Sequence, residues 1–387
     1  MQSFTFHTPT EIVFGKNSET QVSSLVRKYG GSRVIIVYGG GSVVRSGLLG
    51  GIKGQLDNEG IAYIEFGGIQ PNPLLSRAYE GIATAIAFET DFVLAVGGGS
   101  AIDTAKAIAH GVANPDIDIW KFWLREEVVT KSLPVGVVLT ISAAGSETSV
   151  SAVLTNGETG KKRGLGTDLN RPRFAVMNPE LTFTLPKEQI AYGITDILMH
   201  TMDRFFTQVT GNETTDEIAA AILRVVIKNG LIAMENPCDY HAMSEIMWCG
   251  SLSHNGITGL GNPMDFSVHQ LGHELSGRFD VAHGASLSCM WGSWARYVLD
   301  INPARFERYA RLVWGLHDAE EGILATEKYF NKIGMPTCFT ELGVGIQEAD
   351  LLNELADSCV FYGKRLVGNF KPLDKNDCLL IYKIANR

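Results

Sequence analysis

The stretch Phe92-Val-Leu-Ala-Val-Gly-Gly-Gly-Ser100 joins an apolar run to a glycine-rich turn. Five consecutive apolar residues bounded by glycines indicate a strand that is buried on both faces. Comparable runs occur at residues 33–38, 61–66, 135–140 and 174–177. Because helical patterns separate these runs, the sequence predicts a doubly wound α/β domain with a parallel sheet over residues 1–185.

From Pro186 onward, the apolar residues follow the 3.6-residue period of helices, and Pro186 itself suits the first turn of a helix. The helices predicted in this half cover residues 187–206, 215–235, 239–257, 264–277, 284–299, 303–315 and 319–333. We therefore expect residues 186–387 to form an all-helical domain. Two domains also suit a chain of 387 residues.

The composition argues against several classes of partner. The formal charge is −9, from 33 basic and 42 acidic side chains without a dense Lys/Arg run, so we expect no nucleic-acid partner. No segment approaches about 18 consecutive apolar residues and no export signal begins the chain, so we expect no membrane partner and a cytoplasmic location. The six cysteines form no C-x-x-C pair, which suits free thiols in a reducing compartment.

The tetrapeptide Gly-Gly-Gly-Ser follows two of the predicted strands, at residues 39–42 and 97–100. Glycines there let the backbone approach a pyrophosphate, and a helix that begins just beyond offers unpaired N–H groups to the anion. Neither turn completes G-x-G-x-x-G, because Val44 and Ile102 occupy the third glycine position. One such turn is a weak signal, but two in the same half favour a dinucleotide-binding, Rossmann-like domain.

Polar residues beyond the second turn have two interpretations each. Asp103 can form a capping box with Ser100, or the same helix start can face cofactor phosphates. Residues 140–147 offer hydroxyls that would fit a ribose or the nicotinamide amide, although an ordinary loop has the same composition. Lys162 is either a solvated surface lysine or a contact to a phosphate or ribose.

Five residues in the helical half have the spacing of a metal site. Asp196 and His200 are separated by four residues, His269 and His273 repeat that spacing, and His283 follows. An isolated pair of this kind usually forms a surface hydrogen bond, but a carboxylate on an apolar helix is costly to bury alone. Imidazole and carboxylate ligands without thiolate suit Fe²⁺, Zn²⁺, Co²⁺ or Ni²⁺. Five candidates for four positions leave one histidine for the chemistry.

Read together, these features resemble the iron-containing (group III) alcohol dehydrogenase family over essentially the whole chain, and most of all its NADPH-dependent aldehyde reductases and butanol dehydrogenases. The resemblance implies a dehydroquinate synthase-like fold. The segments that carry it are Phe4–Gly15, Gly67–Pro73, Gly97–Asp103, Gly145–Glu147 and the set from Asp196 to His283.

The resemblance also implies roles for individual residues. It implies that Asp196, His200, His269 and His283 bind the metal, and that His273 acts as a nearby proton-handling group. The cofactor contacts that it implies are Gly39, Gly40, Ser42, Asn72, Gly97, Gly98, Ser100, Asp103, Thr140, Lys162 and Leu181. Two positions depart from the family pattern: Ser142 would substitute for a threonine contact, and Asn178-Pro179 replaces Asp-Pro.

The choice of cofactor depends on charge near the ribose 2′ position, because a carboxylate there repels the 2′-phosphate of NADP. The first glycine turn, residues 38–42, contains no acid, and Arg45 lies nearby. We therefore expect NADP(H) to be preferred over NAD(H). A rival interpretation takes Glu65, at the end of the second predicted strand, as the ribose acid and predicts NAD.

The activity that the resemblance implies is hydride transfer between NADP(H) and short- to medium-chain aldehydes or primary alcohols, in a cleft between the two domains. One divalent metal, Fe²⁺ or Zn²⁺, would assist, and the chain would form a homodimer. Three alternatives stay open. They are a polyol (glycerol or diol) dehydrogenase that uses NAD, a dehydroquinate synthase-like enzyme, and a catalytically silent nucleotide- or metal-binding module.

Overall fold

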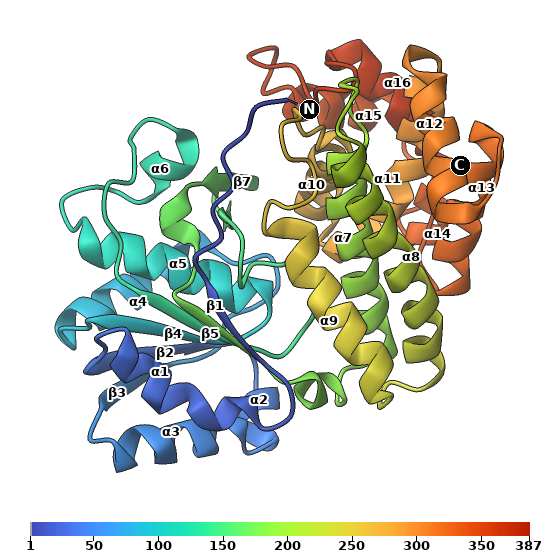
Figure 1. Cartoon of the computed structure of the whole chain (residues 1–387). Helices are drawn as coiled ribbons and strands as arrows, with labels where there is room; N and C mark the ends of the chain where they lie inside the picture. Colours follow the sequence, from blue (N-terminus) through green and yellow to red (C-terminus); the bar gives the residue numbers. More distant parts are fainter. Residues whose placement is uncertain (1) are drawn as a thin grey trace. The chain divides into compact units, whose positions relative to one another are not determined.

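A computed structural model describes residues 2–387 and divides them into two units (Figure 1). The α/β unit comprises Thr8–Thr184, and the helical unit comprises residues 2–7 together with Leu185–Arg387. The short N-terminal segment therefore joins the helical unit, where the amide of Gln2 donates a hydrogen bond to Asn212 Oδ1 at 3.1 Å.

The α/β unit contains a six-stranded sheet in which every neighbouring pair is parallel, in the order β1-β8-β5-β4-β2-β3. The strands are β1 (Glu11–Phe14), β2 (Arg33–Tyr38), β3 (Ala62–Phe66), β4 (Phe92–Gly97), β5 (Val135–Leu139) and β8 (Phe174–Met177). All six residues of β4 are buried. The predicted parallel sheet is confirmed, and its buried central strand is the one inferred from the run at Phe92.

Helices cover the sheet on two sides, as a doubly wound fold requires. They are α1 (Val22–Lys28), α2 (Ser42–Arg45), α3 (Leu48–Asn58), α4 (Leu75–Ala87), α5 (Gly99–Ala113) and α6 (Trp120–Leu124), with 3₁₀ turns η1 (Ser18–Gln21), η2 (Asp168–Asn170) and η3 (Pro179–Thr182). Apolar residues of α1 and α3 pack with β2 and β4 in one cluster. A second cluster joins α4, α5 and α6 to an antiparallel hairpin of β6 (Ser151–Asn156) and β7 (Lys161–Gly166).

The second unit is helical, as predicted, and α7 and α11 are buried along most of their length. Its longer helices are α7 (Lys187–Phe205), α8 (Glu213–Glu235), α9 (Tyr240–His254), α10 (Ser267–Phe279), α11 (His283–Val298), α13 (Ala319–Lys332), α15 (Ala349–Cys359) and α16 (Lys375–Ala385). Shorter elements are α12 (Pro303–Tyr309), α14 (Phe339–Leu342), η4 (Leu299–Ile301) and a π-helical turn at Ala310–Trp314. Among residues 2–387, no helix has the length and apolar content needed to cross a membrane.

Some helix boundaries differ from the sequence pattern for identifiable reasons. The helix expected from residue 264 begins at Ser267, because Phe266 is left-handed and Asp265 Oδ2 accepts a hydrogen bond from the Ser267 amide at 3.0 Å. The helix expected over residues 303–315 changes to a π-helical turn after Tyr309. All six cysteines are free thiols, in agreement with the prediction.

Candidate metal centre and cofactor site

Helix α7 carries two of the predicted metal ligands on one face. Asp196 and His200 are one turn apart, and both side chains are buried. Helices α8, α9, α10 and α11 contact α7, which is why nearly every residue after Ile190 is excluded from solvent. A carboxylate in such surroundings requires a compensating partner, because loss of its hydration is costly. Histidines from two other helices supply one.

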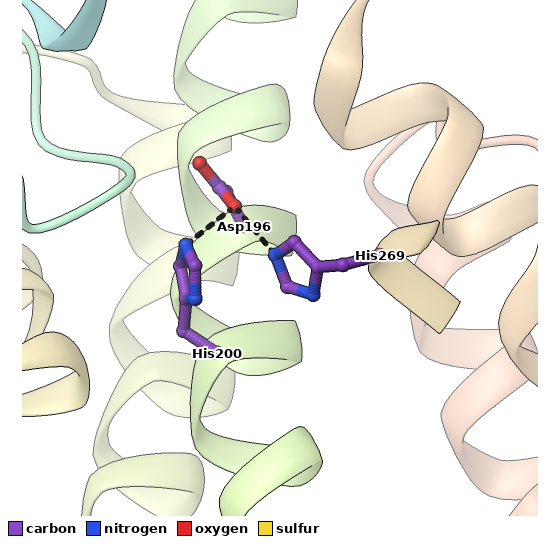
Figure 2. A group of neighbouring side chains, drawn as sticks. All are labelled: Asp196, His200 and His269. Atoms are coloured by element: carbon purple, nitrogen blue, oxygen red, sulfur yellow. Dashed lines mark ion pairs between the residues drawn. The ribbon is translucent and has the colours of Figure 1, made fainter. Parts of the chain in front are cut away.

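Three imidazole nitrogens converge on a single carboxylate oxygen, Asp196 Oδ1. Its distances to the Nε2 atoms are 3.3 Å for His200 and 3.7 Å for His269 (Figure 2). His283, the first residue of α11, brings its Nε2 to 3.8 Å from the same oxygen. Donor atoms of Asp196, His200 and His269 all lie within 4.8 Å of one another. The fold thus gathers residues that are up to 87 positions apart in sequence.

The spacing and chemistry of these donors fit a divalent ion. Ligands at about 2.1 Å in tetrahedral geometry lie about 3.4 Å from one another, close to the distances measured here. Asp196 Oδ1 and His269 Nε2 are buried and have no hydrogen-bond partner among residues 2–387. Buried polar atoms are normally satisfied, so two such atoms that face each other indicate a ligand between them. The donor set, imidazole and carboxylate without thiolate, suits iron or zinc.

The glycine turns lie at the carboxyl ends of β2 and β4 in the α/β unit. Strand β4 pairs in parallel with both β2 and β5, so the carboxyl ends of the three strands are neighbours. The predicted residues there are Gly39, Gly40 and Ser42 after β2, Gly97 at the end of β4 with Gly98 and Ser100 after it, and Thr140 and Ser142 after β5. The Thr140 amide donates to the Gly97 carbonyl at 3.1 Å. Ligands of open α/β sheets bind at this edge.

The capping box predicted for Ser100 and Asp103 is wrong. Helix α5 begins at Gly99 with Gly98 as its N-cap residue, which puts Ser100 inside the first turn, and no side chain caps the helix. Asp103 instead accepts hydrogen bonds from Ser146 Oγ at 2.5 Å and from the Val153 amide at 2.9 Å. Its carboxylate therefore holds the segment after β5 and the hairpin against α5.

Lys162 and Asn72 contact each other although they are far apart in sequence. Lys162 Nζ donates to Asn72 Oδ1 at 2.9 Å, and the lysine is buried, so the surface-lysine interpretation is wrong. Ser142 Oγ is buried without a hydrogen-bond partner among the described residues, so the segment that departs from the family pattern still presents a hydroxyl. Leu181, in η3, packs against the apolar cluster of the sheet. Asn178 caps the same turn, which supports a local structural role.

Two protein-family models match the chain, one in each of the two units. The model "Iron-containing alcohol dehydrogenase" matches residues 9–179, and "Fe-containing alcohol dehydrogenase family, C-terminal" matches residues 190–386. The chain belongs to the iron-containing alcohol dehydrogenase family. As a member of that family, it is an NAD(P)-dependent oxidoreductase of alcohols and aldehydes, with a divalent metal and the dehydroquinate synthase-like fold.

Individual relatives of this iron-containing alcohol dehydrogenase cover between 89% and all of its length. NADH-dependent butanol dehydrogenase A of Clostridium acetobutylicum is 40% identical over 99% of each chain. NADPH-dependent aldehyde reductase YqhD of Escherichia coli is 34% identical over 89% of this chain and 90% of its own. The crystal structure of NADH-dependent butanol dehydrogenase A from Thermotoga maritima superposes with a TM-score of 0.95 at 32% identity, and covers 100% of this chain and 99% of that one.

The donor group consists of Asp196, His200, His269 and His283. Two of its histidines have pKa shifts in opposite directions. Burial, together with the neighbouring His254 and His269, lowers the pKa of His200 well below its usual value of 6.5. Burial also opposes protonation of His269, but the carboxylates of Asp203 and Asp196 raise its pKa to about 9. Because a ligating imidazole must be neutral, metal binding to this iron-containing alcohol dehydrogenase should displace a proton near neutral pH.

The sequence pattern missed two residues beside the donor group. His254, at the end of α9, stacks on His200 with ring centroids 4.0 Å apart, and no spacing rule connects them. Asp203 accepts a hydrogen bond from His269 Nδ1. The sequence did contain a signal for Asp203, because an acid seven residues after Asp196 lies on the same face of α7. His273, one turn beyond His269, has its ring centroid 5.2 Å from that of His283.

The pattern also missed Lys106, a lysine with no exposed surface in the middle of α5. Its Nζ donates to the Ser146 carbonyl at 2.8 Å, to Ser146 Oγ at 2.9 Å and to the Ser151 carbonyl at 2.6 Å. Burial lowers the pKa of Lys106 to about 8, although Asp103 opposes the shift. Lys106 and Asp103 thus hold the same polar segment beside the glycine turn, and Lys106 lies too deep to be a surface charge.

Proposed function

We propose that the chain is an NADP(H)-dependent aldehyde reductase that interconverts short- to medium-chain aldehydes and primary alcohols, with one Fe²⁺ or Zn²⁺ per chain. The observation that carries this proposal is the convergence of three imidazole nitrogens on Asp196 Oδ1 at 3.3–3.8 Å. The relatives named butanol dehydrogenase and aldehyde reductase support the substrate class.

Four side chains would hold the ion: Asp196, His200, His269 and His283. When bound, the metal supplies Lewis acidity toward a carbonyl oxygen, and the nicotinamide supplies or accepts hydride. His273 would hold a proton on its imidazole close to the donor group and exchange it with the alcohol oxygen, because an imidazole can both donate and accept a proton. Its half-buried position leaves it open to solvent for that exchange.

The residues at the sheet edge would hold the cofactor mainly with main-chain groups and hydroxyls. Gly39, Gly97 and Gly98 let the backbone approach the pyrophosphate. Asn72, Lys162 and Ser142 offer polar atoms beside these turns. The remaining proposed contacts, in the same segments, are Gly40, Ser42, Ser100, Asp103, Thr140 and Leu181.

The preference for NADP(H) rests on charge. Glu65, the rival ribose acid, already binds Lys53 Nζ at 2.5 Å and accepts a hydrogen bond from Tyr38 at 3.0 Å. The hydrogen bond from Lys53 lowers the pKa of Glu65, so the carboxylate is already paired with a lysine. Arg45, beside the first glycine turn, is the cation that we expect to face a 2′-phosphate. The proposed preference differs from that of several relatives, which are named as NADH-dependent butanol dehydrogenases.

Steady-state kinetics test the proposal directly. Purified protein loaded with Fe²⁺ or Zn²⁺ should oxidise NADPH when butyraldehyde is added, with a higher kcat/KM for NADPH than for NADH. A clear NADH preference would reject the cofactor assignment and leave the activity intact. Cofactor binding without oxidation, with every metal tried, would instead support a catalytically silent nucleotide-binding module.

A diol substrate is the second candidate, because 1,3-propanediol dehydrogenase of Klebsiella pneumoniae is 27% identical over 90% of this chain. Oxidation of 1,3-propanediol with NAD at a higher kcat/KM than 1-butanol would favour it. We also propose a cytoplasmic homodimer, on the basis of the free thiols and the family resemblance. Sedimentation analysis at micromolar concentration tests the dimer.

A further inference from the structure

Asp203 is a buried acid in α7 with no role in the proposed ligand set. Its side chain is 1% exposed, and its Oδ2 accepts a hydrogen bond from His269 Nδ1 on α10. Among residues 2–387, His269 supplies the only ion pair of this carboxylate. The adjacent Arg204 is directed elsewhere, since its Nη1 donates to the His200 carbonyl at 2.6 Å. Loss of that partner would leave a buried charge uncompensated, so the carboxylate of Asp203 and the ring of His269 hold each other in place.

The hydrogen bond fixes which nitrogen of His269 can bind a metal. Donation from Nδ1 to Asp203 leaves the lone pair on Nε2, and Nε2 is the atom that faces Asp196 Oδ1 at 3.7 Å. The ring of His269 therefore lies between two carboxylates of the same helix, one on each side. Rotation of the ring by a half turn would break both contacts. The geometry favours one ring orientation and, for the neutral ring that a metal requires, the tautomer with its proton on Nδ1.

Asp203 also contacts the segment before α10 through its main chain. The Asp265 amide donates to the Asp203 carbonyl at 2.8 Å, and the Asp265 carboxylate in turn caps the Ser267 amide. The backbone contact positions the start of α10, while the side chain orients one residue on it. A substitution of the Asp203 side chain leaves the carbonyl contact in place, so the two contributions can be separated.

We propose that Asp203 is a positioning residue that orients His269 and thereby strengthens metal binding without touching the ion. The inference rests on the proposed metal site. Carboxylates that hydrogen-bond to a ligating histidine typically contribute 10–100-fold to metal affinity. Two variants separate the contribution of the negative charge from that of the hydrogen bond. Asp203→Asn keeps a hydrogen-bond acceptor of the same shape but removes the charge, whereas Asp203→Ala removes both.

The test is a Co²⁺ titration of the metal-stripped full chain against a competing chromophoric chelator. We expect one ion per wild-type chain, about 10-fold weaker binding for Asp203→Asn and about 100-fold weaker binding for Asp203→Ala. The visible Co²⁺ spectrum should change in both variants, because His269 would then bind in an altered orientation. Excess metal should restore most of the turnover of Asp203→Asn, which a misfolded variant would not allow.

Asp216→Asn is the matched control. Asp216 is a buried acid of α8 in the same unit, and its partners are Arg305 and Arg308 rather than a histidine. This control should melt at a lower temperature but bind Co²⁺ within twofold of wild type. Equal weakening in Asp216→Asn and Asp203→Asn would overturn the inference, as would wild-type affinity in Asp203→Asn. Absence of binding by the wild-type chain would overturn the proposed metal site itself.

Discussion

The carboxyl edge of the sheet and the donor group of the helical unit are built in opposite ways. At the sheet edge, glycines, main-chain amides and hydroxyls predominate, and the charged residues Asp103 and Lys106 hold the segments in place. In the helical unit, the chemistry resides in a few buried charged side chains. The first region should therefore be sensitive to added side-chain volume, and the second to the loss of single side chains.

The largest expected effect comes from removal of a proposed ligand. His200→Ala should bind little metal and lower kcat by about 1,000-fold, because a Lewis acid contributes several kcal/mol to the transition state. Metal analysis and steady-state kinetics measure the two effects. NADPH binding, followed by fluorescence, should be unchanged. Full metal content and turnover in this variant would remove the donor group from the catalytic scheme.

His273→Ala should separate proton handling from metal binding inside the same region. General acid–base groups typically contribute 100-fold or more, so we expect kcat to fall by about 100-fold. Metal content should equal that of the wild type. The pH profile of kcat, measured for both proteins with butyraldehyde, shows whether His273 titrates in turnover. Identical profiles and rates would assign its function to another group.

Gly97→Ala should damage the sheet edge alone. A Cβ atom there would lie 2.9 Å from the Cβ of Ala101, which forces the backbone of the turn to move. Overpacking costs about 2 kcal/mol, which corresponds to about a 30-fold rise in KM for NADPH. Metal content should not change. Gly164→Ala is the control, because its Cβ would meet only Val153 at 3.9 Å, and it should retain the wild-type KM.

The smallest effect concerns His110, a histidine of the α/β unit with no metal role. Its Nε2 lies 2.8 Å from Asn170 Oδ1, and burial lowers its pKa from 6.5 to about 4. Between these pH values the unfolded chain binds more protons, so folding stability falls as pH decreases from about 6.5 toward 4.

Urea unfolding at pH 7.5 and pH 5 measures this contribution. The wild type should lose about 2 kcal/mol more than His110→Gln over that interval, and both should retain activity at pH 7.5. Equal losses would mean that other groups govern the acid response. The result would contrast a histidine kept neutral by burial with His269, whose carboxylate neighbours favour its protonated form.

The sequence predicted the regions that depend on local patterns. The apolar run and glycines at Phe92–Ser100 specified both a buried strand and the turn after it, because the strand and turn signals are local. The i,i+4 spacing brought Asp196 with His200, and His269 with His273, onto helix faces. The hairpin β6–β7 was not predicted, because its strands are partly polar and contain two glycines, Gly164 and Gly166.

Residues whose roles depend on distant partners could not be predicted in the same way. Lys106 lies in an alanine-rich helix, where a lysine usually faces solvent, and only the contacts to Ser146 and Ser151 explain its burial. Asp103 fitted a capping pattern, but the helix began two residues too early for Ser100 to cap it. Asp203 contacts His269 of α10, and His254 contacts His200 of α7. Both contacts depend on tertiary packing, which local sequence patterns do not reveal.

The assignment of residues 2–7 to the helical unit has a consequence for synthesis on the ribosome. Gln2 contacts Asn212 through its amide, and a Cβ on Gly261 would lie 2.9 Å from Gln2 Cβ. The α/β unit is complete once Thr184 has emerged, but Gly261 follows about 80 residues later, or roughly 4–16 s at ordinary elongation rates. During that interval residues 2–7 have been made but lack part of their native surroundings.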